Sequence, residues 1–230
     1  MRLPRKLINY GSSAILLEWE QKIDPGINQS VHAYAASVRN HPGVLEAVPA
    51  YNSMLVTYDP KQISAFSLKE WIYDLEITDP PLATGKQHIL PVVYGGEYGP
   101  DLDEVASLLN LTAKRVIKFH TSVEYRVYQM GYQPGFAFLG LTSQKLEISR
   151  RDSPRSLVPA GSVGLAGRQT GIYPHDAPGG WQLIGRCPWS LWRSDTEPNA
   201  RLKAGDTVKF YAITAKDWGA EKERGYTWTK

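Results

Sequence analysis

The sequence predicts an α+β protein of two units, a small mixed unit over residues 1–85 and a strand-rich unit over residues 86–230. Three observations support this prediction. Short apolar runs alternate with two helical patterns in the first part of the chain. A polar, proline-rich stretch, Thr78 to Gly85, then has the composition of a linker. Beyond it, many glycines and prolines interrupt short strand-like runs, which is typical of a closed barrel.

The first strand and the first helix have clear local signals. An apolar run over residues 13–19 predicts a strand. Asp24 is a suitable N-cap for the helix that follows, and Pro25 stands at its first helical position. Its apolar residues then recur at helical spacing up to a stop at residues 40–43. They are Ile27, Val31, Tyr34 and Val38.

Two strands and a second helix follow in the first unit. Residues 44–50 and 53–58 have the pattern of a hairpin around Tyr51-Asn52. The second helix is expected to begin at Ser67, which has capping-box spacing with Glu70. Phe66 and Trp71 occupy the two positions of a hydrophobic staple. A further strand over residues 89–94 would complete a ferredoxin-like split βαβ unit.

The second unit is expected to begin with two short helices and to continue as strands. Asp101 with Glu104 caps the first of these helices, and Thr112 caps the second. Residues 125–130 alternate between apolar and polar side chains, as in a strand. A last strand over residues 207–213 follows a turn at residues 203–206.

The composition fits a compact protein and argues against several partners. Hydrophobic residues make up 42% and charged residues 21% of the 230 positions, close to the averages for globular proteins. The net charge is +3, from 26 basic and 23 acidic residues spread along the chain, so we expect no nucleic-acid partner. No run reaches the roughly 18 apolar residues of a membrane span, so we expect no membrane partner.

A single cysteine and the N-terminal residues indicate the compartment. Cys187 has no second cysteine to pair with, which excludes an internal disulfide and a multi-cysteine metal site. The apolar run at residues 14–17 is too short for a signal peptide. We therefore expect a cytoplasmic protein.

Several catalytic signatures are missing from the sequence. It has no Gly-rich phosphate loop ending in Gly-Lys-Ser/Thr, no His-Glu-x-x-His zinc helix and no Gly-x-Ser-x-Gly elbow. Residues 160–164 surround Ser162 but lack the first glycine of the elbow, so a nucleophilic Ser162 is not expected. The five histidines show no metal-ligand spacing, and we expect no metal site.

Five blocks rich in glycine, proline and aromatic residues stand out instead. They are Tyr94-Gly95-Gly96-Glu97-Tyr98-Gly99-Pro100-Asp101-Leu102, His120-Thr121 with Tyr125, Gly131-Tyr132-Gln133-Pro134-Gly135-Phe136, Pro159-Ala160-Gly161-Ser162-Val163 and Pro178-Gly179-Gly180-Trp181-Gln182-Leu183-Ile184-Gly185. In this order they resemble the 5-oxoprolinase B-subunit family, also known as allophanate hydrolase subunit 1, which includes Kip-type inhibitors of a sporulation histidine kinase. The resemblance covers residues 88–213 through these blocks and residues 7–80 through their pattern of elements.

The resemblance implies a fold and a function. It implies a cyclophilin-like β-barrel for the second unit, in agreement with its many short strands. It also implies that the chain is the B-subunit of a bacterial hydrolase that converts 5-oxo-L-proline to L-glutamate together with A- and C-subunits. That reaction consumes ATP, and since the chain has no phosphate loop, we expect no activity of the chain alone and an ATP site shared with the C-subunit.

Two other functions stay open at this point. A Kip-type inhibitor would bind a histidine kinase through the same fold, and a neighbouring kinase gene in place of genes for the A- and C-subunits would favour it. Peptidyl-prolyl isomerase activity is suggested by the barrel alone, and fold does not imply function.

Two residues are candidates for chemistry. His120 could act as a general base with Glu124 nearby, or it could simply stabilise the end of a short helix. Arg155 lies close to Arg150 and Arg151, and a guanidinium group can bind a carboxylate or phosphate with two hydrogen bonds. The alternative for these arginines is a solvated surface position.

Ligand-binding candidates come from the motif blocks, because glycines allow close approach of the backbone and aromatic rings offer stacking faces. The alternative is a set of tight turns over a core tryptophan. The candidates are Pro134, Gly135, Phe136, Ser162, Gln169, Pro178, Gly179, Gly180 and Trp181.

Overall fold

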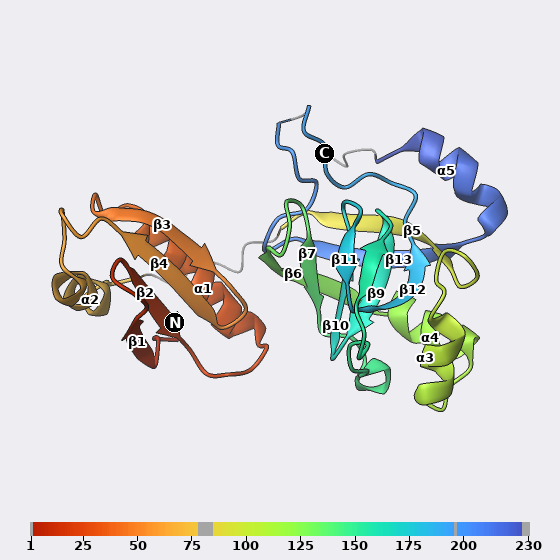
Figure 1. Ribbon diagram of the computed structural model, residues 1–230, viewed down its shortest axis with the longest axis horizontal. Coiled ribbons are helices and arrows are strands. Elements are labelled where there is room, and N and C mark those ends of the chain that lie inside the picture. The colour runs from red at the N-terminus through yellow and green to blue at the C-terminus, as the bar shows by residue number, and fades with distance from the viewer. Residues whose placement is uncertain (1, 78–84, 196, 227–230) are drawn as a thin grey trace. The chain divides into compact units, whose positions relative to one another are not determined.

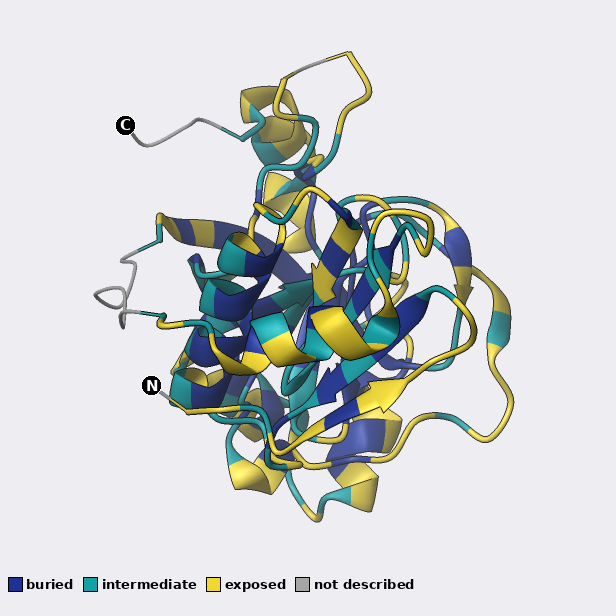
Figure 2. Cartoon of the chain, turned by 90° about the vertical axis from the view of Figure 1, so that its left-hand side faces the viewer, coloured by how far each residue is buried: buried dark blue, intermediate teal, exposed yellow. Residues whose placement is uncertain are grey.

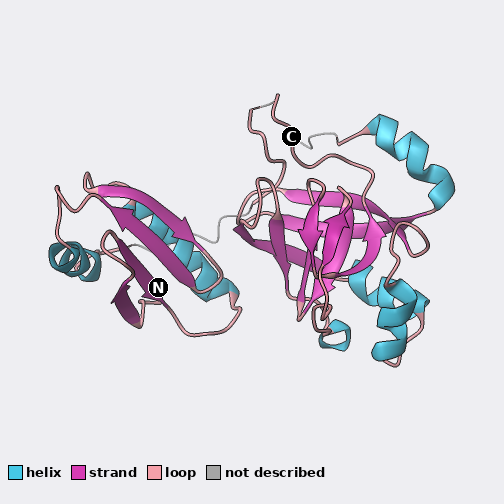
Figure 3. Ribbon diagram, in the orientation of Figure 1, coloured by secondary structure: helices cyan, strands magenta, loops and turns pink. Residues whose placement is uncertain are grey.

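The computed structural model describes residues 2–77, 85–195 and 197–226, in two compact units, Met1–Ala83 and Thr84–Lys230. The expected linker at residues 78–85 therefore lies outside the described residues except for Gly85. Figure 1 labels the elements of each unit, and Figure 3 shows that strands make up most of the second unit.

The first unit is a four-stranded antiparallel sheet with two helices. The sheet order is β1-β2-β4-β3. The elements are β1 (Lys6–Asn9), β2 (Ala14–Glu18), α1 (Pro25–Val38), β3 (Val44–Pro49), β4 (Ser53–Tyr58) and α2 (Ala65–Tyr73). The predicted strand at 13–19, the first helix and the hairpin are thus confirmed. Asp24 caps α1 as expected, since its side chain accepts a hydrogen bond from the backbone N–H of Ile27 at 2.9 Å.

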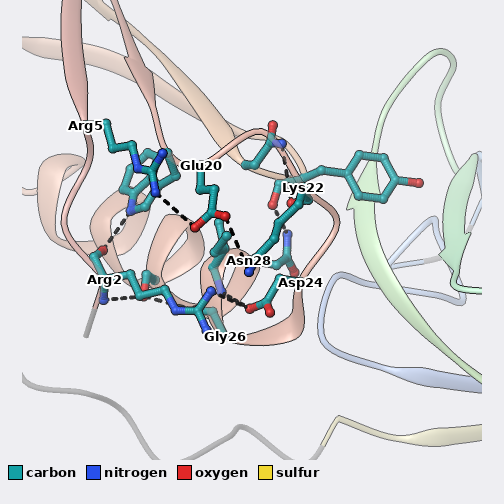
Figure 4. Close-up of polar contacts among 12 residues, drawn as sticks. Arg2, Arg5, Glu20, Lys22, Asp24, Gly26 and Asn28 are labelled. Carbon is teal, nitrogen blue, oxygen red and sulfur yellow. Dashed lines mark hydrogen bonds and ion pairs between the residues drawn. The ribbon is translucent and has the colours of Figure 1, made fainter.

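Burial follows the period of each element in this unit, as the alternating colours of Figure 2 show. In β4, Met54, Val56 and Tyr58 are buried while the residues between them are half-buried. Helix α1 packs its apolar residues against the same core, which includes Ile27, Val31 and Val38. Exposed ion pairs, Arg5–Glu20 at 3.1 Å and Arg2–Asp24 at 2.9 Å, lie at the margin of this core (Figure 4).

Two details of the first unit differ from the prediction. Helix α2 begins at Ala65, and its cap is Ser64, whose hydroxyl accepts a hydrogen bond from Ser67 N at 3.0 Å. Phe66 is 70% exposed and cannot act as a staple. The strand at 89–94 does not complete this sheet either. The edge beside β2 is occupied by β1, which sequence reasoning missed and which forms an N-terminal hairpin with β2.

The second unit is a closed seven-stranded barrel with the order β10-β7-β6-β13-β5-β12-β9, and a separate pair β11-β8. Its strands are β5 (Gln87–Tyr94), β6 (Glu124–Met130), β7 (Ala137–Gly140), β8 (Arg155–Val158), β9 (Ser162–Ala166), β10 (Gln169–Ile172), β11 (Ala177–Gly179), β12 (Gln182–Arg186) and β13 (Thr207–Ile213). The predicted strands at 125–130 and 207–213 are confirmed, as is the closed barrel.

Short helices lie outside the barrel strands (Figure 1). They are α3 (Leu102–Leu108), α4 (Ala113–Thr121), α5 (Trp218–Arg224) and the 3₁₀ turns η1 (Gln144–Leu146) and η2 (Ala215–Asp217). Thr112 caps α4 as predicted, by accepting from Arg115 N at 3.3 Å. The side chain of Asp101 makes no cap hydrogen bond to α3, so that part of the prediction is wrong.

Candidate functional site

A buried carboxylate, Asp101, joins the start of α3 to strand β12. Asp101 is only 3% exposed. Its Oδ2 accepts from Leu183 N at 2.6 Å, and its own N–H donates to the Leu183 carbonyl at 2.9 Å. A carboxylate is costly to bury unless it is paired and hydrogen-bonded, so these contacts fix its position. The side chain expected to cap a helix instead forms the centre of a polar cluster.

Two arginines share the other oxygen of this carboxylate. Asp101 Oδ1 accepts from Arg155 Nη2 at 2.5 Å and from Arg151 Nη1 at 3.2 Å. Arg151 Nη1 also lies 3.6 Å from Glu104, whose side chain is 61% exposed. Since the interaction with an exposed carboxylate is weakened by water, the two half-buried arginines share one buried negative charge, that of Asp101.

Three buried polar atoms of this region have no hydrogen-bond partner among the described residues. They are Arg155 Nη1, Arg151 Nε and Gln182 Oε1. Buried polar atoms in proteins are nearly always hydrogen-bonded, so such atoms mark a place where a ligand or water can bind. Two guanidinium N–H donors suit a carboxylate or phosphoryl group.

A pocket of about 450 Å³ lies beside the cluster. Its polar lining combines two cations, Arg150 and Arg151, and two acids, Glu104 and Asp152, with Gln182, Ser149 and Ser153. Its volume is that of a site for a small molecule. Arg155 does not line this pocket. The sequence favoured Arg155, but the structure assigns the pocket wall to Arg151 and places Arg155 against the shared carboxylate.

The Pro178-Gly179-Gly180 segment is held next to these arginines. Gly179 lies opposite Arg155 in the β8–β11 pair. The Gly180 carbonyl accepts from Arg151 N at 2.8 Å. The exposed Tyr132 donates its hydroxyl hydrogen to the carbonyl of Pro178. Together with the contact between Asp101 and Leu183, these contacts bring together three glycine-rich blocks that are distant in the sequence, at residues 94–102, 131–136 and 178–185.

An aromatic cluster packs against the Pro178-Gly179-Gly180 segment. Phe136 and Trp181 are buried, with ring centroids 5.6 Å apart at 89°. Phe136 and Tyr173 lie 5.2 Å apart. A Cβ on Gly179 would stand 2.5 Å from the Tyr173 hydroxyl, so a larger residue there would require the Tyr173 side chain to shift. Burial raises the pKa of Tyr173 to about 12. The geometry favours the reading of Phe136 and Trp181 as core residues.

The other ligand-binding candidates lie elsewhere on the barrel. Ser162 is buried at the start of β9, and Gln169 is half-buried at the start of β10. Pro134 is exposed in the loop before β7. Gly135 lines a different pocket, of about 930 Å³, together with Lys203 and others. The arginine cluster and these residues therefore do not form one pocket.

His120 lies inside the barrel with both ring nitrogens bonded. Its Nδ1 contacts the Tyr94 hydroxyl at 2.7 Å and its Nε2 the Thr170 hydroxyl at 2.9 Å. Because Thr170 donates to the Gly164 carbonyl at 2.9 Å, it accepts from Nε2–H, and Tyr94 then donates to Nδ1. Burial lowers the pKa of His120 to about 3. Glu124 instead accepts a hydrogen bond from the Gln87 side chain. This arrangement favours the structural reading of His120.

Sequence reasoning missed Asp101 and Gln182 as parts of the site. Asp101 and Leu183 are 82 residues apart, so their contact left no local signal. Two features of the sequence could have predicted the contact: an acidic residue, Asp101, inside a glycine-rich block, and a cluster of arginines with no acidic partner assigned to it. Within the described ranges, no three potential metal ligands cluster and no helix is long and apolar enough to cross a membrane.

A family model described as "Carboxyltransferase domain, subdomain C and D" matches residues 6–202. The 5-oxoprolinase B-subunit of Bacillus subtilis (strain 168) is 43% identical over 227 residues, which cover 93% of this chain and 95% of that protein. The 5-oxoprolinase B-subunit of Escherichia coli O157:H7 is 39% identical over 204 residues, with coverage of 87% and 92%.

Solved structures share the fold. The crystal structure of TTHA0988 superposes with a TM-score of 0.78 at 35% identity over 88% of this chain. This chain spans only 40% of the length of that protein. The Kluyveromyces lactis urea carboxylase has a TM-score of 0.77 at 18% identity, over 95% of this chain and 22% of that one, which is a likeness of fold alone.

Proposed function

Because this chain belongs to the 5-oxoprolinase B-subunit family, we propose that it is the B-subunit of a multi-subunit hydrolase that converts 5-oxo-L-proline to L-glutamate. The observation that carries the proposal is the match to the Bacillus subtilis protein, which extends over nearly the full length of both chains. The Bacillus subtilis and Escherichia coli relatives both bear this name, so inhibition of a histidine kinase is not proposed.

The chemistry explains why such a hydrolase would use ATP. The lactam of 5-oxoproline is a resonance-stabilised amide and a poor electrophile. Transfer of the γ-phosphoryl group to its carbonyl oxygen, with departure of ADP, activates the ring carbon for attack by water. The first water adds to that carbon and the C–N bond breaks, which leaves a free amine and an acyl phosphate. A second water then displaces phosphate and yields glutamate. We propose that the B- and C-subunits carry out phosphorylation and that the A-subunit opens the ring.

Binding of ATP is proposed for the assembled complex and not for this chain alone. The chain lacks a phosphate loop, so its contribution would be side chains at a site shared with the C-subunit. At the level of fold, we propose that the barrel is cyclophilin-like and that the first unit is a variant of the ferredoxin-like arrangement in which β1 takes the outer position.

The arginine cluster is our candidate for anion recognition in this reaction. The substrate has a carboxylate, and the phosphorylated intermediate adds a phosphoryl group. Arg151 lines the pocket, and Arg155 shares Asp101 with it, so a bound anion would meet donors that are already oriented. The Pro178–Gly180 segment would hold Arg151 in place through the Gly180 carbonyl.

Reconstitution tests the function. We expect no ATP hydrolysis and no glutamate from the purified chain, and glutamate formation when the A- and C-subunits of the same organism are added. Glutamate production by those two proteins at the same rate without this chain would contradict the proposal, as would turnover by this chain alone.

Conservative substitutions test the arginines within that complex. A lysine keeps the charge but loses the two-pronged geometry, so Arg155→Lys and Arg151→Lys should each impair turnover nearly as much as alanine. We expect a loss between about tenfold and a thousandfold, equivalent to roughly 1.4–4 kcal/mol. Arg224→Lys, at an exposed position of α5, is the control. Wild-type rates for both cluster variants would remove them from the site.

A further inference from the structure

A second cationic surface lies on helix α4, apart from the arginine cluster. The helix contributes Lys114, Arg115 and Lys118, all exposed, and the turn η1 adds Lys145. Arg115, Lys118 and Lys145 lie beside the half-buried ring of Phe119, and Lys114 lies one turn before Lys118 on the helix. Arg115 stands over that ring at 5.5 Å from its centroid and Lys145 at 5.3 Å. We call these five residues the α4 patch.

The charges of the α4 patch are not neutralised within the protein. None of its four cations forms an ion pair with a carboxylate in the part of the chain that the structure describes. Helix α4 contains no acidic residue, whereas α5 mixes Glu221 and Glu223 with its cations. Lys114 and Lys118 are four residues apart on one helix face, where like charges destabilise a helix.

Helix stability does not account for this pattern. Lys118 in the last turn interacts favourably with the negative end of the helix dipole. Lys114 and Arg115 lie in the first turn, where a cation meets the positive end and is unfavourable. The sequence therefore places two cations at the N-terminal end of α4 at a cost in stability, which points to a use outside the helix.

The shape of the α4 patch narrows the choice of partner. Arg115, Lys118 and Phe119 line a pocket of about 220 Å³, too small for a nucleotide but large enough for an aliphatic side chain. Phe119 packs on the barrel core and has two cations over its ring, so it offers no open face for a stacked base. We propose that the α4 patch binds an acidic segment of a partner protein, with one apolar side chain in the small pocket beside Phe119.

A charge-matched pair of variants tests this proposal. The probe is a short dye-labelled glutamate-rich peptide with one central leucine, and binding is followed by fluorescence anisotropy at low salt. Lys118→Glu should weaken binding about tenfold or more, because it places a carboxylate at the centre of the patch. Lys216→Glu makes the same change of net charge at an exposed lysine of η2 and should change the affinity by less than about twofold.

Further measurements make the outcome decisive. The melting temperature of Lys216→Glu should match the wild type, whereas Lys118→Glu should melt slightly lower, because it places a carboxylate at the negative end of the α4 dipole. Both variants should remain folded at the temperature of the binding assay, since both positions are exposed. The same peptide with glycine in place of leucine should bind the wild type more weakly. Equal loss in Lys118→Glu and Lys216→Glu would overturn the proposal. A single-stranded DNA of equal charge serves as the second probe. If the wild type bound it more tightly than the peptide, and Lys118→Glu abolished that binding, the patch would be a nucleic-acid site and the proposal would also be overturned.

Discussion

The two units treat charged groups in opposite ways. In the first unit, the ion pair Arg5–Glu20 has side chains that are 65% and 42% exposed. In the barrel, the pair His88–Asp206 has side chains that are each 1% exposed. Asp101 is nearly as deeply buried, at 4% for its side chain. Both units have apolar cores, so the difference lies in where the charges are placed.

This difference shows where function can be located in the chain. An exposed pair contributes little, because water screens it and its loss leaves two solvated groups. A buried charged group is stable only when its partners are present. Removal of one member of a buried pair is therefore costly, because it leaves the other member buried without a partner. Loss of an exposed pair should therefore cost little in either unit, whereas loss of a buried carboxylate of the barrel, Asp101 or Asp206, should cost more. Asp101 also lies at the proposed anion site.

Asp101→Asn is the sharpest test of that contrast. The amide cannot neutralise Arg151 and Arg155, so the barrel should lose about 3–4 kcal/mol of stability, less than for a fully enclosed pair because both guanidinium groups reach solvent. Glu20→Gln removes the acidic partner of an exposed pair in the first unit and should cost less than about 0.5 kcal/mol. Hydrogen exchange of β12 and β2 amides reads the two units separately. Similar losses in both variants would contradict the contrast.

Glycine substitutions extend the comparison to backbone packing. A Cβ on Gly99 would lie 2.1 Å from the Ile184 carbonyl oxygen, and this backbone must shift to admit it. We expect Gly99→Ala to cost about 2–3 kcal/mol. In the first unit, a Cβ on Gly43 would meet the Ile63 side chain at 2.7 Å, which can rotate away. Gly43→Ala should cost about 1 kcal/mol or less. Denaturant midpoints of the two variants would decide whether backbone contact is the determining factor.

The sequence predicted elements better than contacts. Period and capping located α1, the hairpin and the strand at 207–213, because those signals are local. The start of α2 was misplaced, since Ser64 and Ser67 both suit a cap and only the structure shows which hydroxyl meets a free N–H. Strand β5 was joined to the wrong sheet because its partner β13 lies far along the chain.

The site followed the same rule. The motif blocks and the arginine cluster could be seen in the sequence, since they are runs of neighbouring residues. Their meeting at Asp101 could not, because the carboxylate reaches Leu183 and Arg155 only through the closure of the barrel. Burial decided the remaining roles. Phe136 and Trp181 were candidates for stacking on a ligand, and the packing that buries them favours a core role.

His120 predicts a pH dependence confined to the barrel. Burial lowers the pKa of His120 from 6.5 to about 3 in the folded chain. Between pH 6.5 and about pH 3, His120 is therefore protonated in the unfolded chain but neutral in the folded barrel. Its stabilising effect is complete above pH 6.5 and is lost as the pH falls, by about 1.4 kcal/mol per pH unit. Denaturant unfolding at several pH values should show a flatter slope for His120→Gln. An unchanged slope would mean that the folded barrel admits the proton.

The smallest expected change in stability concerns Asp24, the cap of α1. Variants at this position distinguish the contribution of its hydrogen bond from that of its charge. Asp24 accepts a hydrogen bond from Ile27 N at 2.9 Å and pairs with Arg2 at 2.9 Å (Figure 4). The Ile27 hydrogen bond is the main cause that lowers the pKa of Asp24, with Arg2 adding to it. Asp24→Ala loses both contacts and should cost about 1 kcal/mol, while Asp24→Asn keeps the cap and should cost about 0.3 kcal/mol. Arg2→Ala removes only the exposed pair and should resemble Asp24→Asn. If Asp24→Asn were as destabilising as Asp24→Ala, the charge would matter at this surface, and the contrast with the barrel would be one of degree.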